Sequence, residues 1–129
     1  MVSIKKSALV LYSREEMFNL VDSVEDYPNF LPWCGGTEVI KKSTKITKAS
    51  IKINYRGVKQ TFTTENNKSS PEKMVIKLIN GPFKELSGEW RFKALDKNAC
   101  RIELELHYQF NNIILEKLIS PVFNIIANT

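Results

Sequence analysis

The stretch RIELELHYQF, residues 101–110, decides the fold because its side chains alternate strictly between apolar and polar. The apolar set is Ile102, Leu104, Leu106, Tyr108 and Phe110, and the polar set is Arg101, Glu103, Glu105, His107 and Gln109. Successive side chains of a β-strand point to opposite faces of the sheet. The stretch therefore predicts a strand with one covered face and one face in water.

The same period of two recurs through the chain from about Thr37 onward. It occurs in KASIKINY (48–55), VKQTFTTE (58–65), KMVIKLI (73–79) and LSGEWRFKA (86–94). Arg56-Gly57 is typical of a tight hairpin turn between the first two of these segments. Residues 2–9 predict a further strand. Together these segments predict an antiparallel sheet of six to seven strands.

Helix signals stand at both ends of the chain. Ser13 followed by Glu16 forms a capping box that predicts a helix start, and residues 24–30 predict a second short helical turn, interrupted by prolines 28 and 32. After Asn112, apolar residues from Leu115 to Ile126 fall at helical spacing. We expect an α+β fold, a curved antiparallel sheet wrapped on a C-terminal helix, in a single domain of residues 1–129.

Composition fits an ordinary globular domain. The chain has 129 residues, 43% hydrophobic and 26% charged, with a net charge of +5. Its two cysteines have no metal-binding spacing, and we expect a reducing compartment. Residues 113–127 are apolar but shorter than the roughly 20 residues of a membrane span. We expect a soluble cytoplasmic protein; a peripheral membrane location and the oligomeric state are left open.

Catalytic patterns are scarce. His107 is the only histidine and falls on the polar face of its strand, where a solvated residue is the simpler interpretation. Glu103 and Glu105 fit ion pairs with Arg91, Lys93 or Arg101 better than an acid/base pair. Cys34 has no neighbour that would lower its pKa, and no metal ligand set is present. We expect no catalysis, no catalytic residue and no required cofactor.

The apolar side chains favour ligand binding instead. The segment EDYPNFLPWCGG (25–36) is too irregular for a strand, and we expect it to close one end of a groove between sheet and helix. A filled core is the alternative for any single residue, but grooves lined by aromatics are typical small-molecule sites. The candidate ligand-binding residues are Tyr27, Phe30, Leu31, Pro32, Trp33, Phe62, Met74, Phe83, Trp90, Phe92, Tyr108 and Phe123.

A second candidate surface is basic. Its members are Lys41, Lys42, Lys45, Lys48, Lys52, Arg56 and Lys59. Such a stripe could follow RNA phosphates with salt-dependent affinity, as a ribosomal surface requires. Solubility explains the charge equally well. Aromatics for base stacking are absent among these residues, so sequence-specific readout and a DNA partner are not indicated.

Four segments resemble the coenzyme Q-binding protein and ribosome association toxin (RatA) family of the START-like, polyketide cyclase-like superfamily. They are YPNFLPWC (27–34), KQTFTTEN (59–66), NGPFKELSGEWRF (80–92) and ACRIELELHYQF (99–110). Their order and spacing match from about residue 3 to residue 129. The TFTT and ACRIE blocks are closer to the bacterial toxins than to the mitochondrial branch.

The resemblance implies a helix-grip fold and two functions. Mitochondrial members bind ubiquinone and support respiration without catalysing a reaction. The bacterial name refers to binding of the large (50S) ribosomal subunit, which blocks 70S formation and so inhibits translation initiation. Family members usually continue the last helix for several turns beyond the point where this chain stops. Binding of a ubiquinone-type lipid is the leading expectation, the ribosome toxin is the alternative, and an antitoxin partner is left open.

Overall fold

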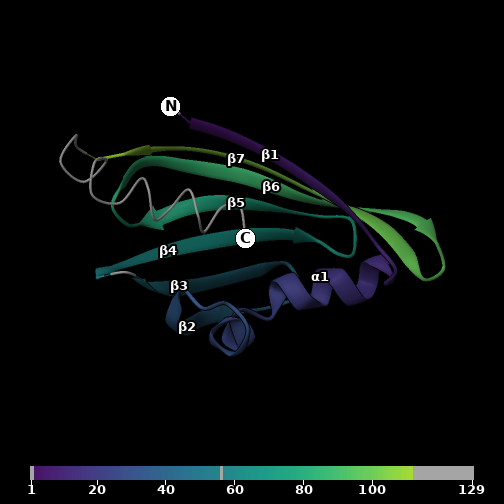
Figure 1. Cartoon of the computed structure of the whole chain (residues 1–129), viewed down its shortest axis with the longest axis horizontal. Coiled ribbons are helices and arrows are strands. Elements are labelled where there is room, and N and C mark those ends of the chain that lie inside the picture. The colour runs from purple at the N-terminus through teal and green to yellow at the C-terminus, as the bar shows by residue number, and fades with distance from the viewer. Residues whose placement is uncertain (1, 56, 112–129) are drawn as a thin grey trace.

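The computed structural model describes residues 2–55 and 57–111. Figure 1 shows a long curved sheet with the short helices gathered beside one end of it. The elements in chain order are β1 (Val2–Val10), α1 (Arg14–Asp22), the 3₁₀ helix η1 (Val24–Asn29), β2 (Cys34–Lys42), β3 (Ile46–Tyr55), β4 (Val58–Ser69), β5 (Lys73–Asn80), β6 (Phe83–Asp96) and β7 (Ala99–Phe110).

The strands of the described residues form one sheet with the order β1-β7-β6-β5-β4-β3-β2. Every neighbouring pair is antiparallel, and β1 lies beside β7 at the end of the described chain. Strands β2 to β7 follow one another as hairpins, which short loops allow only between antiparallel neighbours. The predicted antiparallel sheet and its number of strands are confirmed.

Local sequence signals explain the first helix and the central hairpin. At the start of α1, the Glu16 backbone N–H donates to Ser13 Oγ at 3.1 Å and the Ser13 N–H donates to Glu16 Oε1 at 3.3 Å. This is the predicted capping box. Gly57 has a φ of 81°, a left-handed value that glycine adopts without strain, and it turns β3 into β4. The second predicted helical turn is η1, which keeps Pro28 inside it.

Part of the prediction for the segment 25–36 was wrong. Residues 34–36 are not irregular but begin β2, where Cys34 pairs with Ile53. The Asn54 N–H donates to the Trp33 carbonyl at 2.9 Å, which extends the ladder by one residue. Gly35 fits here because a Cβ atom would lie 2.8 Å from Asn54 Cβ. The predicted C-terminal helix, with Phe123, lies outside the described residues, as does Arg56.

Candidate ligand-binding face

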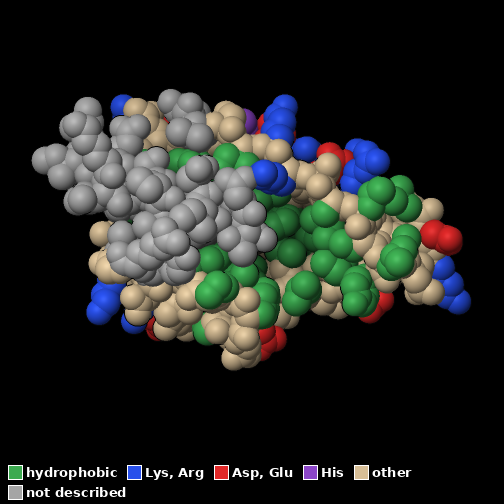
Figure 2. All heavy atoms as spheres, viewed as in Figure 1, with side chains coloured by type: hydrophobic (Ala, Val, Ile, Leu, Met, Phe, Trp, Pro, Cys, Tyr) green, Lys and Arg blue, Asp and Glu red, His purple; other side chains and the backbone are tan. Residues whose placement is uncertain are grey.

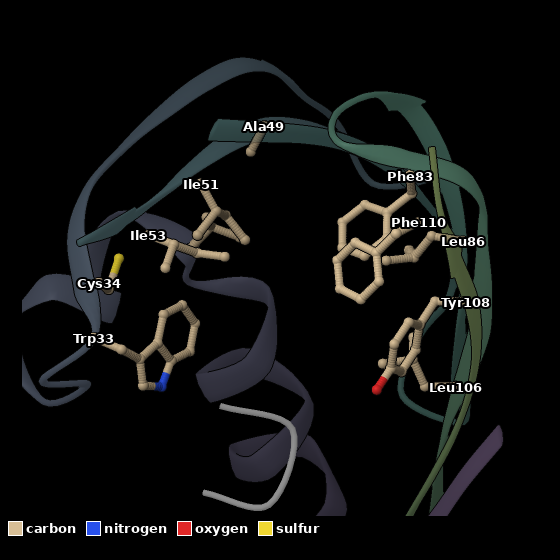
Figure 3. Close-up of a cluster of buried hydrophobic side chains, with 11 residues drawn as sticks. Trp33, Cys34, Ala49, Ile51, Ile53, Phe83, Leu86, Leu106, Tyr108 and Phe110 are labelled. Carbon is tan, nitrogen blue, oxygen red and sulfur yellow. The ribbon is translucent and has the colours of Figure 1, made fainter. Parts of the chain in front are cut away.

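The concave face of the sheet carries the main apolar cluster of the described residues. It comprises Val24, Trp33, Cys34, Ala49, Ile51, Ile53, Phe83, Leu86, Leu106, Tyr108 and Phe110. Figure 3 shows two walls that face each other under an arch, one from residues 33–53 and the other from β6 and β7. We call this arrangement the two-walled cluster. Figure 2 shows apolar side chains gathered on one face of the described part of the molecule.

Strand parity puts these side chains on one face. In β3, Ala49, Ile51 and Ile53 are buried at every second position. In β7, Leu106, Tyr108 and Phe110 do the same. The alternation predicted from the sequence is therefore confirmed for both walls.

Aromatic contacts stiffen the β6–β7 wall. The ring of Phe83 stacks on Phe110 with centroids 4.9 Å apart, and Tyr108 meets Phe83 edge-on at 6.0 Å. Gly88 lets the two strands approach closely, because a Cβ atom there would lie 2.5 Å from the Glu105 carbonyl oxygen. Gly88, the second glycine of the segment NGPFKELSGEWRF, is therefore required by the close packing of β6 against β7. Burial raises the pKa of the Tyr108 hydroxyl, so the group stays protonated at neutral pH.

Trp33 belongs to the opposite wall and leaves a polar atom unsatisfied. Its side chain is buried, with 8% exposed, and its indole Nε1 has no hydrogen-bond partner among the described residues. Next to it, the Cys34 thiol donates to the Gly36 carbonyl at 3.6 Å. Burial raises the pKa of this thiol, so Cys34 is not an activated nucleophile.

The predicted rim is divided between buried and exposed residues. Tyr27 and Leu31 are half-buried against the two-walled cluster. The Tyr27 hydroxyl donates to the Val21 carbonyl, and burial is the main reason that its pKa is raised. Phe30 meets the Tyr27 ring edge-on at 5.9 Å but is 50% exposed, and Pro32 is exposed as well. Phe62 of β4, another predicted residue, also packs against the two-walled cluster, and the centroid of its ring lies 6.2 Å from that of Phe83.

The expectation of one shared interior is wrong for three predicted residues. Met74 and Phe92 form a second cluster with Phe18 of α1, and Trp90 packs against it. Phe18 meets Phe92 edge-on at 5.4 Å, while Trp90 stacks beside Phe92 at 6.3 Å. These side chains have the predicted parity, but they lie further along the strands, where α1 covers them. We call this group the α1 cluster.

A buried ion pair on the concave side was not predicted. Lys68 Nζ lies 2.9 Å from Asp22 Oδ2, and the two side chains are 4% and 11% exposed. Thr47 donates its hydroxyl to Asp22 Oδ1 at 2.7 Å. These bonds join the last residue of α1 to β3 and β4. Parity could have revealed Lys68, which shares the inward register of Phe62 and Thr64.

The β6–β7 half of the convex face carries a network of paired charges. Arg91 lies 2.6 Å from Glu89, 3.6 Å from Glu103 and 3.5 Å from Glu105, and Lys93 lies 2.9 Å from Glu103. Hydrogen bonds from Lys93 and His107 lower the pKa values of Glu103 and Glu105, respectively. The predicted ion pairs with Arg91 and Lys93 are confirmed, and both carboxylates stay ionised at neutral pH.

His107 belongs to this network. Its Nε2 lies 3.1 Å from Glu105 Oε1, its Nδ1 lies 2.8 Å from Ser3 Oγ, and its side chain is 34% exposed. It therefore occupies the predicted outward position rather than a cleft.

The candidate lysines separate into groups. Lys41, Lys48, Lys52 and Lys59 share the convex face of β2, β3 and β4, and none has an ion pair within the described part of the chain. We call these four the convex lysines. Lys42 instead lies 3.3 Å from Glu25 of η1, and Lys45 lies in the turn before β3.

Neither a metal centre nor a membrane span is seen where the structure can be described. No group of three metal-ligating side chains lies together among these residues. No helix formed by them is long and apolar enough to cross a membrane.

Comparison with known proteins gives a family match. Residues 10–129 match the family described as polyketide cyclase / dehydrase and lipid transport. The ribosome association toxin RatA of Escherichia coli is 39% identical over 127 residues, which covers 98% of this chain and 80% of the toxin. A mitochondrial coenzyme Q-binding protein of Drosophila melanogaster is 23% identical, and the match covers 95% of this chain and 52% of that protein.

Solved structures share the fold. A START superfamily protein from Mycobacterium smegmatis superposes with a TM-score of 0.78 at 16% identity, covering 98% of this chain and 92% of its own. An aromatase/cyclase from a Streptomyces species also superposes with a TM-score of 0.78, at 15% identity. This match covers 86% of the present chain and 69% of the aromatase/cyclase chain. The curved antiparallel sheet agrees with both. This chain belongs to the polyketide cyclase / dehydrase and lipid transport family, has the fold of the START superfamily structures, and is related to the RatA toxins.

Proposed function

We propose that this chain is a non-catalytic binding protein for an apolar, ring-bearing lipid of the quinone class, held on the concave face. One observation carries the proposal: the two-walled cluster brings aliphatic and aromatic side chains from opposite ends of the sheet to face each other. Such walls present apolar and aromatic surface to a flat ring, and an alkyl tail gains about 0.8 kcal/mol for each buried CH₂ group. The names of the family and of the coenzyme Q-binding relative support the same ligand class.

The charged groups fit binding better than catalysis. Glu103, Glu105 and His107 are engaged with one another and with basic residues on the convex face, away from the two-walled cluster. On the concave side, Asp22 is held by Lys68 and Thr47. An acid or base for a cyclase-type reaction would need to reach the ligand. The convex groups lie on the opposite face of the sheet, and Asp22 is engaged by Lys68 and Thr47.

Organic extraction and titration test the lipid proposal. Purified protein is extracted and the extract is analysed by mass spectrometry for quinones. Protein freed of lipid is then titrated with decylubiquinone by calorimetry. We expect saturable binding of one molecule per chain. No binding by folded protein would overturn the proposal.

A matched pair of variants locates the site. Ile51→Trp enlarges the β3 wall towards the opposite wall, so we expect it to weaken decylubiquinone binding by more than tenfold. Val75→Trp adds the same ring on the exposed convex face and should leave binding unchanged. Equal affinities of the two variants would remove the site from the concave face.

Binding to the large ribosomal subunit is a second candidate function, supported by a different face. The four convex lysines lack ion pairs in the described part of the chain, and free ammonium groups are suited to phosphate contacts. The printed name of the 39% identical relative, ribosome association toxin, supports this candidate. Both functions can coexist because they use opposite faces of the sheet.

Charge reversal at equal net charge tests the ribosome candidate. We expect Lys41, Lys48 and Lys52 changed together to Glu to lower co-sedimentation with large subunits at least tenfold. The control changes Lys6, Lys84 and Lys97 to Glu, three exposed lysines with no ion pair in the structure as described. Equal losses in both variants would mean that only net charge matters and would reject the convex surface as the contact.

A further inference from the structure

The indole nitrogen of Trp33 is a buried hydrogen-bond donor with nothing to donate to among the described residues. Buried polar atoms in folded proteins are almost always paired, because an unpaired donor loses its bonds to water and gains nothing in return. Trp33 is nevertheless held firmly, with its backbone carbonyl bonded to the Asn54 N–H. The exception leaves this donor available to a partner beyond the described residues.

The surroundings of the indole limit what that partner can be. The neighbours of Trp33 on its wall are Cys34, Ala49, Ile51 and Ile53. The Cys34 thiol is engaged with the Gly36 carbonyl. A water molecule needs several polar partners to be held in place, and these aliphatic side chains provide none. Figure 3 shows the indole nitrogen at the edge of the ring, with the Tyr108 oxygen projecting from the opposite wall.

We propose that the ligand carries a carbonyl oxygen which accepts a hydrogen bond from Trp33 Nε1. This inference rests on the proposed lipid-binding function and assigns the residue that holds the carbonyl oxygen of the ligand. A ring ketone or quinone offers an acceptor in the plane of a flat apolar ring, so ring and oxygen can be bound together between the walls. A pure hydrocarbon has no acceptor for the indole N–H. An ammonium group only donates hydrogen bonds, so it cannot accept one from the indole either.

A pair of ligands that differ only in the acceptor isolates this bond. Decyl-trimethylbenzoquinone and the matching decyl-trimethylbenzene have the same tail and methyl groups, but the second lacks the carbonyl oxygens. We expect Trp33→Phe to lower the ratio of quinone affinity to hydrocarbon affinity about three- to tenfold, the range for one neutral hydrogen bond. The ratio cancels any loss of packing, since both ligands meet the same altered wall.

Trp90→Phe is the matched control, because Trp90 lies in the α1 cluster. It should keep the wild-type preference for the quinone. NMR gives a direct second readout: the indole N–H signal that is missing in Trp33→Phe should move downfield with the quinone and not with the hydrocarbon.

The outcomes separate the two proposals. An unchanged ratio of quinone affinity to hydrocarbon affinity in Trp33→Phe would overturn the hydrogen bond and leave lipid binding intact. Failure of the wild type to bind either ligand would overturn the proposed function itself, and this inference with it.

Discussion

The concave and convex faces are built from the same strands, yet they satisfy their polar groups in different ways. On the convex side of β6 and β7, Arg91 alone contacts three carboxylates. On the concave side, the Trp33 nitrogen is buried without a partner in the described structure. These carboxylates are paired by basic side chains of the described chain, whereas the Trp33 indole is the donor that our proposal assigns to a ligand. The comparison teaches that the same alternating strands can pair the polar groups of one face and leave a buried donor unpaired on the other.

The largest effect should come from the concave ion pair. Lys68→Met leaves the Asp22 carboxylate buried at the end of α1, where the helix dipole also disfavours a negative charge. We expect the free energy of unfolding to fall by about 3–5 kcal/mol, as when a buried pair loses one partner. Chemical denaturation measures it.

Lys42→Met is the control, since it breaks the more exposed pair with Glu25. An exposed pair is worth about 0–1 kcal/mol. Equal costs for the two variants would show that burial does not set the strength of the Asp22–Lys68 pair.

A smaller effect is expected from the close approach of β6 and β7. Gly88→Ala places a methyl group 2.5 Å from the Glu105 carbonyl oxygen, so the strands must move apart. We expect a loss of about 1–3 kcal/mol, typical of overpacking. Gly36→Ala, which meets nothing within 4 Å, should change stability by less than about 0.5 kcal/mol. A Gly88→Ala variant as stable as the wild type would argue against this tight contact.

The smallest effect is the loss of stability at acidic pH that comes from the convex carboxylates. Because the pKa values of Glu103 and Glu105 are lowered in the folded protein, their stabilisation is fully present above the unfolded value of about 4.3. This stabilisation is lost as the pH falls through the lowered pKa values that the two carboxylates have in the folded protein. Denaturation midpoints measured from pH 7 to pH 3 should therefore fall less steeply for Glu103→Gln than for the wild type. Identical slopes would show that Glu103 gains nothing from its basic neighbours.

Sequence patterns predicted the faces well and the grouping along the strands poorly. Alternation placed Ile53 and Tyr108 inside and Glu105 outside, because parity is a local property of a strand. It could not tell that Phe92 lies under α1, since that depends on how far along the sheet the helix reaches.

Irregular pairing hid two further features. A bulge between Val39 and Lys41 shifts the register of β2, so Lys41 turns to the convex face opposite Lys48. The start of β2 at Cys34 depends on pairing with Ile53, which no local signal around the glycine pair indicated. The unpaired Trp33 nitrogen follows from three-dimensional packing and has no signature in the sequence.

Methyl NMR of the protein titrated with decylubiquinone tests the central claim most directly, because it reports which face the lipid contacts. Our account predicts saturable shifts for the methyl groups of Ile51, Ile53 and Leu106 on the two walls. Val75 on the convex face and Leu95 near the β6–β7 turn should not shift. Shifts confined to Val75 and Leu95, or no saturable shift at all, would contradict a lipid site on the concave face.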